Sequence, residues 1–188
     1  PYFERHGLDC TYVGHPVLQS GADQGDGAAF RSQHGISSDA ALLAMLPGSR
    51  TGEASRLLPV FTDTIERIRS SIPSLEIVVP TVIATHLQVQ TQSASWSVPV
   101  HLIDNDMDKY AAFAAADVAL AASGTVALEL AMAGTPAVIA YKMAPVTGFL
   151  ARRLVSAPYA SLINLILGRE AVPEYLLENC RSELIAQA

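Results

Sequence analysis

The segment that decides the fold is Ser123–Pro136, SGTVALELAMAGTP, in which a turn of small residues opens a helix and a Gly-Thr-Pro turn ends it. Such a helix start presents backbone N–H groups and the positive end of the helix dipole to an anion, typically a phosphate. Glu129 lies four residues after Thr125, so its carboxylate can accept hydrogen bonds from ribose hydroxyls beside the same turn. Phosphate and sugar together indicate a nucleotide. The same spacing also fits a capped helix on which Glu129 is simply solvated.

A second turn of this kind lies upstream, where the apolar run 41–46 leads into Pro47-Gly48-Ser49-Arg50. An amphipathic helix follows, with apolar residues at spacings of three and four that predict packing on a sheet: Leu57, Leu58, Phe61, Ile65 and Ile68. Gly48 and Ser49 leave the approach to Arg50 open, and a guanidinium can bind a phosphate through two hydrogen bonds. The alternative for Arg50 is a surface ion pair with Glu53.

Short apolar runs alternate with helical patterns along the chain. We expect strands at 41–46, 75–79, 100–102, 118–121 and 137–140, and helices at 53–70, 108–115 and 126–133. Continuous apolar strands separated by crossover helices predict an α/β fold, a Rossmann-like parallel sheet with helices on both faces. Ligands of such sheets bind at the carboxyl ends of the strands, where both small-residue turns are expected to lie.

Composition excludes several functional classes. The 188 residues carry a net charge of −6, which argues against a nucleic-acid partner. Cys10 and Cys180 are the only cysteines, too few and too far apart for a disulfide framework or a zinc site, so a reducing cytoplasm is expected. The last third mixes apolar residues with Lys142, Arg152, Arg153 and Arg169. That mixture fits an anionic membrane surface or an acylated phosphosugar, and equally an ordinary amphipathic helix.

No metal or familiar nucleotide fingerprint is indicated. The spacings of the P-loop and of the Gly-x-Gly-x-x-Gly motif are absent, which argues against ATP hydrolysis and NAD chemistry. Asp104-Asn105-Asp106 matches the bare Asp-x-Asp pattern of metal-dependent glycosyltransferases, but we interpret it as a solvated acidic loop. The five histidines lack metal-ligand spacing, and His15 is interpreted as a turn residue before Pro16.

Eight stretches of the chain, in order, resemble the lipid-A-disaccharide synthase family of inverting glycosyltransferases. They are YVGHP at 12–16, LPGSR at 46–50, LEIVVP at 75–80, ASGT at 122–125, AYKM at 140–143, ARRLV at 151–155, YASLINL at 159–165 and GRE at 168–170. No single stretch is specific, but their order and spacing together are. Two positions depart from the family pattern: Ile163 replaces a usual proline, and the loop 104–106 is more acidic.

The resemblance implies the donor-binding half of a two-domain GT-B glycosyltransferase. Residues 1–18 would be the end of a truncated amino-terminal Rossmann-like domain, with Cys10–Val13 as its last strand. Residues 19–34 would be a linker, and residues 35–188 a nucleotide-sugar-binding Rossmann-like domain whose carboxyl end could be truncated. Because the chain begins with Pro1 and has no initiating Met, we expect it to be a piece of a longer protein.

The resemblance also assigns the site. The residues implied in UDP binding are Gly48, Ser49, Arg50, Ser123, Gly124, Thr125, Glu129, Asn164 and Arg169. Arg50 would stabilise the departing diphosphate, while the general base would be an acidic residue of the other domain. Asn164, Arg169 and Glu170 would reach the nucleotide across an exchanged homodimer. Their alternative role is helix capping and a surface turn at Gly168.

The implied reaction transfers 2,3-diacylglucosamine from UDP to 2,3-diacylglucosamine 1-phosphate, in lipid A biosynthesis, without a metal or other cofactor. The enzyme would be cytoplasmic and peripheral on the inner membrane, and this chain alone would bind UDP without turnover. One alternative is an enzyme similar to UDP-N-acetylglucosamine 2-epimerase, against which the stretch 159–165 argues. The other is a non-catalytic nucleotide-sugar-binding domain.

Overall fold

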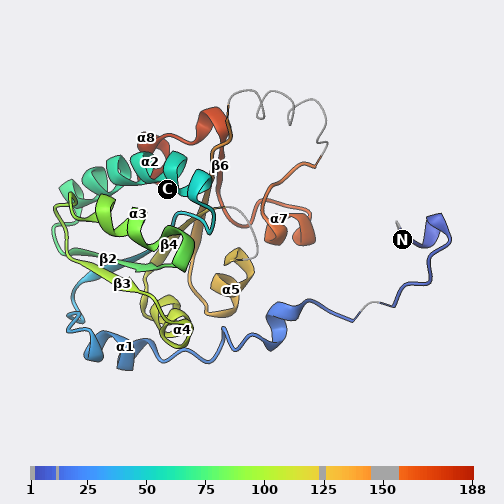
Figure 1. Cartoon of the computed structure of the whole chain (residues 1–188), viewed down its shortest axis with the longest axis horizontal. Coiled ribbons are helices and arrows are strands. Elements are labelled where there is room, and N and C mark those ends of the chain that lie inside the picture. The colour runs from blue at the N-terminus through green and yellow to red at the C-terminus, as the bar shows by residue number, and fades with distance from the viewer. Residues whose placement is uncertain (1–2, 12, 123–125, 145–156) are drawn as a thin grey trace.

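The computed structural model describes residues 3–11, 13–122, 126–144 and 157–188 (Figure 1). Its strands are β1 (Ala41–Leu46), β2 (Leu75–Pro80), β3 (Val100–Ile103), β4 (Val118–Ala122), β5 (Ala137–Tyr141) and β6 (Glu174–Leu176). Its α-helices are α1 (Gly27–Gln33), α2 (Thr51–Ser71), α3 (Ile83–Ser93), α4 (Asp106–Ala115), α5 (Val126–Met132), α7 (Leu162–Leu167) and α8 (Ser182–Gln187). Short 3-10 helices are η1 (Glu4–His6), η2 (Pro16–Gln19) and η3 (Leu177–Asn179).

The strands form one parallel sheet in the order β3-β2-β1-β4-β5-β6. Strand β1 is central, with Leu43 opposite Ile77 of β2 on one side and opposite Val118 of β4 on the other. The order of the strands along the chain reverses between β1 and β4. This is the arrangement of the Rossmann-like α/β fold, so the predicted fold class is confirmed.

A hydrophobic core covers each face of the sheet. Side chains of β1 alternate between the two cores, with Leu43 and Met45 in one and Leu42 and Ala44 in the other. The first core is closed by residues of α2, α3 and α8, and the second by residues of α1, α4, α5 and α7. Because both faces are buried, the strands read as continuous apolar runs, which is why the sequence revealed them.

The strands and helices predicted between residues 41 and 140 agree with the structure within two residues at each end. Among the described α-helices and strands, five were not predicted, namely α1, α3, β6, α7 and α8. Helix α3 illustrates the reason, because its buried positions are Thr85, Val89 and Ser93, of which only Val89 is apolar. The spacing of four is present, but hydrophobicity does not mark it.

Two observations concern the amino-terminal region. Residues 10, 11 and 13 are not part of a strand here, and since the resemblance assigns them to a domain mostly outside this chain, their place in that domain stays a prediction. The predicted linker, 19–34, includes helix α1, which packs on α4 and buries Phe30 in the core. His15 has the predicted turn role, since its Nδ1 accepts a hydrogen bond from the Val17 N–H at 3.1 Å and caps η2.

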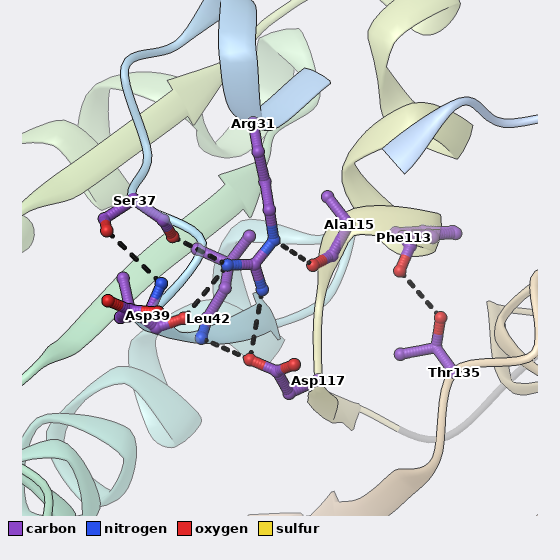
Figure 2. Close-up of polar contacts among 9 residues, drawn as sticks. Arg31, Ser37, Asp39, Leu42, Phe113, Ala115, Asp117 and Thr135 are labelled. Atoms are coloured by element: carbon purple, nitrogen blue, oxygen red, sulfur yellow. Dashed lines mark hydrogen bonds and ion pairs between the residues drawn. The ribbon is translucent and has the colours of Figure 1, made fainter. Parts of the chain in front are cut away.

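Arg31 fixes α1 to the amino edge of the sheet (Figure 2). Its guanidinium donates to the carbonyl oxygens of Ala115 at 2.9 Å, Ser37 at 3.1 Å and Ala40 at 2.9 Å, and to Asp117 Oδ2 at 3.1 Å. The same Asp117 oxygen accepts from the N–H of Leu42, the second residue of β1, at 2.8 Å. One side chain therefore joins α1, the end of α4 and the starts of β1 and β4.

The described residues before α1 first pass along α4, where Gly25 lies against the backbone of Tyr110, and then run away from the sheet as an arm (Figure 1). Among the described residues, no helix is both long and apolar enough to cross a bilayer.

Candidate functional site

A cleft of about 370 Å³ opens at the carboxyl edge of the sheet, a size typical of small-molecule sites. Its lining residues come from the ends of β1, β2, β3 and β4 and from the helices that follow them: Leu46, Pro47, Gly48, Ser49, Arg50, Glu53, Pro80, Thr81, Val82, Ile103, Asn105, Lys109, Ala122, Val126 and Glu129. The cleft includes the point between β1 and β4 where the strand order reverses. In open α/β sheets this is where ligands bind.

The loop after β1 forms one wall of the cleft. Gly48 has a φ of +107°, and a side chain there would collide with the carboxylate of Glu53. Arg50 is exposed directly before α2, a helix of 21 residues whose amino end faces the loop. Exposed cationic side chains beside a helix start attract anions, so this wall is suited to a phosphate.

Glu53 sets the charge of that wall. Burial raises the pKa of its carboxyl group above the ordinary value, while the Arg50 guanidinium, the Ser49 backbone N–H and the Arg56 guanidinium each act to lower it. The alternative interpretation of Arg50 as a partner of Glu53 therefore describes a real electrostatic interaction. It does not exclude anion binding, because both side chains line the cleft.

Glu129 also lines the cleft, from α5, which packs on the other face of the sheet from α2. Its Oε2 is 2.7 Å from Lys109 Nζ, and its Oε1 accepts a hydrogen bond from the Tyr110 hydroxyl at 3.2 Å. Both partners belong to α4 and were missed by sequence reasoning. In the sequence, Lys109 is a single lysine in an alanine-rich helix, and this pattern does not identify the residue with which it pairs.

The ends of β2 and β3 are held by internal hydrogen bonds. The Thr81 hydroxyl donates to the carbonyl oxygen of Ile103 at 3.1 Å and lies 2.9 Å from Nδ1 of His86. In the acidic loop, Asn105 caps α4 by accepting from the Asp108 N–H at 2.8 Å. Asp104 is exposed, and the side chain of Asp106 lies outside the described part of the structure. Among the described residues, no cluster of His, Cys, Asp and Glu could hold a metal ion.

Part of the predicted site falls outside the described residues. Ser123, Gly124 and Thr125 lie there, as do Arg152 and Arg153. The residues on either side of the Ser-Gly-Thr turn, Ala122 and Val126, both line the cleft.

Asn164 is placed elsewhere, fully buried on α7 beside Val172 and the first residue of β6, Glu174. Its Nδ2 donates to the Val172 carbonyl at 2.8 Å and to Glu174 Oε1 at 2.7 Å, and its Oδ1 accepts from the N–H groups of Ala171 at 2.7 Å and Val172 at 2.9 Å. An amide side chain makes about four hydrogen bonds, so none of this capacity remains for a ligand. Asn164 therefore holds the loop after α7.

Arg169 and Glu170 are exposed on the turn after α7, whose last turn ends at Gly168 with a φ of +63°. Within the described structure, neither they nor Asn164 are among the residues that line the cleft. The surface turn at Gly168 that we gave as the alternative is present, but α7 is capped by Ser161 and Gly168 and not by Asn164. Contact of Asn164 or Arg169 with a nucleotide stays a prediction.

Comparison with solved structures shows the same fold in glycosyltransferases. WaaG, a glycosyltransferase involved in lipopolysaccharide biosynthesis, superposes with a TM-score of 0.58 at 16% identity, covering 85% of this chain and 40% of that one. Acinetobacter baumannii MurG gives 0.58 at 15% identity, covering 96% and 47%. A putative UDP-N-acetylglucosamine 2-epimerase from Listeria monocytogenes gives 0.54 at 14% identity, covering 97% and 40%. At these identities the likeness concerns the fold alone.

Comparison of sequences is more specific. The lipid-A-disaccharide synthases of Rhodospirillum centenum and Granulibacter bethesdensis are 52% and 44% identical to the chain over 188 and 185 residues, covering 100% and 98% of it. The chain spans about half the length of these curated relatives, 47% of each. A family model described as Lipid-A-disaccharide synthetase matches residues 1–188. Since that match extends over every residue, the chain belongs to the lipid-A-disaccharide synthetase family.

Proposed function

We propose that this chain is the donor-binding half of a lipid-A-disaccharide synthase and that its cleft binds the UDP part of the donor. The observation that carries the proposal is the presence of Gly48, Ser49, Arg50 and Glu129 in the lining of one cleft at the strand-order reversal. Arg50 offers a cation beside a helix start, which suits a diphosphate. Glu129 offers a carboxylate, which suits the hydroxyls of a ribose.

In the proposed reaction, a hydroxyl oxygen of 2,3-diacylglucosamine 1-phosphate attacks the anomeric carbon of the donor. The bond from that carbon to the diphosphate oxygen breaks, and UDP leaves with the electron pair while a general base outside this chain takes the hydroxyl proton. Arg50 would stabilise the negative charge that develops on the leaving diphosphate. The chain alone would therefore bind UDP without turning over substrate.

We propose a metal-independent mechanism, because Arg50 and the start of α2 already supply positive charge to the wall formed by Gly48, Ser49 and Arg50, which we call the phosphate wall. The acylated substrates favour a peripheral position on the cytoplasmic side of the inner membrane, and the family resemblance favours a homodimer. Epimerase activity is less well supported, because the epimerase shares only the fold at 14% identity whereas the synthase family matches the whole chain.

Calorimetric titration of the chain with UDP tests the site. We expect binding that is weakened at least about tenfold by Arg50→Ala or by Glu129→Gln, since each loses a hydrogen-bonding partner of the ligand. Arg69→Ala is the matched control, because Arg69 lies in the last turn of the same helix and pairs with Glu66 at 3.3 Å. Absence of UDP binding by the unsubstituted chain would contradict the proposal.

Activity is tested in a chimera in which the chain replaces the matching half of the Rhodospirillum centenum synthase. We expect the chimera to form the acylated disaccharide 1-phosphate and to release UDP, and we expect Arg50→Ala to suppress both. A chimera that folds and binds UDP but forms no disaccharide would contradict the assigned reaction.

A further inference from the structure

Lys109 is held on three sides, unlike an ordinary surface lysine. Its ammonium nitrogen lies 2.7 Å from Glu129 Oε2, 5.1 Å from the centroid of the Tyr110 ring and 5.6 Å from that of the Phe113 ring. Both aromatic distances are within the range of cation–π attraction. The side chain is 26% exposed and lines the cleft. Its position is therefore set before any ligand arrives.

The carboxylate that Lys109 contacts keeps capacity to accept hydrogen bonds. Lys109 occupies one direction on Oε2, and the Tyr110 hydroxyl occupies one direction on Oε1. Each carboxylate oxygen can accept about two hydrogen bonds, so, counting partners among the described residues, each has one acceptor direction left. Two neighbouring hydroxyl groups, as on the 2′ and 3′ carbons of ribose, could donate one hydrogen bond to each oxygen.

The position of Glu129 depends on its cation. The Glu129 side chain is only 15% exposed, and a charge held away from water is costly unless it is paired. Without the ammonium, the carboxylate would turn toward solvent or toward other donors. The distance from its oxygens to a bound sugar would then no longer be fixed.

We propose that Lys109 is a positioning residue that aims Glu129 at both ribose hydroxyls and thereby makes the cleft selective for ribonucleotides over 2′-deoxyribonucleotides. This inference rests on the proposed function and extends it to a residue on another helix. Lys109 acts through Glu129, so its effect is expected on the choice between sugars.

The test is calorimetric titration of the chain with UDP and with 2′-deoxy-UDP. We expect the unsubstituted chain to prefer UDP by about tenfold, the value of one hydrogen bond to a charged group. Lys109→Met keeps the apolar stem over the aromatic rings and removes the charge, and it should reduce this preference to less than about threefold. Lys109→Arg restores a cation and should recover most of the preference.

Tyr110→Phe provides a second measurement that keeps the ion pair and changes only the donor to Oε1. It should lower the preference by about two- to threefold and is expected to fold, because the ring is retained. Thermal unfolding of each variant shows whether the fold is kept. A stability loss in Lys109→Met with an unchanged preference would show that the ion pair only links α4 to α5, and would overturn the inference.

Three further outcomes are distinguishable. If Lys109→Met weakens both ligands equally, Lys109 acts as a general positive charge and the positioning role is wrong. If the unsubstituted chain binds both nucleotides equally, UDP binding stands and this inference alone fails. If it binds neither, the proposed function fails and the inference fails with it.

Discussion

The carboxylate of Glu53 lies directly against the α-carbon of Gly48, in the space that a side chain at residue 48 would occupy. Gly48 has a φ of +107°, a conformation that residues with a side chain rarely adopt. The two residues therefore depend on each other. The glycine permits the turn after β1, and its missing side chain admits the carboxylate beside Arg50.

Gly48→Ala should weaken UDP binding at least about tenfold, because the new methyl group displaces Glu53 and strains the phosphate wall. Gly168→Ala is the matched control, since its φ of +63° is also positive but nothing lies within 4 Å of the added carbon. That control should lose about 1–2 kcal/mol of stability and keep its UDP affinity. Equal UDP affinities in the two variants would show that the Gly48 loop does not contact the ligand.

Glu53 predicts a pH dependence of stability. Because burial raises the pKa of its carboxyl group in the folded state, the folded protein binds the proton more tightly than the unfolded chain. The contribution of Glu53 to stability is thus favourable below the unfolded value of 4.5 and is lost as the pH rises through the raised folded pKa. The side chain at residue 53 cannot titrate in Glu53→Gln. The unfolding free energy of this variant minus that of the unsubstituted chain should therefore increase as the pH rises through this window. Urea unfolding at pH 4.5 and at pH 7 measures the difference, and a pH-independent difference would contradict the prediction.

Arg50→Ala should slow disaccharide formation in the chimera by about 30- to 1,000-fold, corresponding to about 2–4 kcal/mol of lost leaving-group stabilisation. The control is again Arg69→Ala, which removes the same charge from the far end of α2. Steady-state turnover is the measurement. A rate for Arg50→Ala within about threefold of the parent would remove this residue from the mechanism.

UDP binding should not require a divalent metal, because the phosphate wall carries Arg50 beside the start of α2. Calorimetry with EDTA and with added magnesium should give the same affinity within about twofold. If EDTA abolishes binding and magnesium restores it, the acidic loop 104–106 becomes the site of the metal. Asp104→Asn would then be the variant to test.

Arg31→Ala should lower the free energy of unfolding by about 2–4 kcal/mol, because its four hydrogen bonds join α1 to the sheet (Figure 2). UDP affinity should not change, since this network lies at the amino edge of the sheet and the cleft at the carboxyl edge. Denaturant unfolding and calorimetry separate the two effects. A stability within about 0.5 kcal/mol of the parent would mean that α1 is not part of the folded domain.

Local sequence was sufficient for much of the architecture. Apolar runs such as 41–46 predicted buried parallel strands, since hydrophobic periodicity reports how many faces of an element are covered. The turn at Gly48-Ser49-Arg50 and the helix of Glu129 follow strands that lie side by side. Because parallel strands end at one edge, the sequence could predict that these residues share a site. The helices it missed, such as α3 and α1, are short or have few apolar residues on their buried face. They can be recognised only once the elements on which they pack are known.

What the sequence by itself determined was therefore the parallel sheet, the family and two walls of the cleft, all of which depend on residues close together in the chain. Tertiary structure alone decided that Lys109 of α4 meets Glu129 of α5, because twenty residues separate them and the pairing depends on how two helices pack on the same face. It likewise decided that Asn164 is enclosed by Val172 and Glu174. An asparagine has the same chemistry in a core as in a binding site, and only its surroundings determine whether a hydrogen bond remains for a ligand.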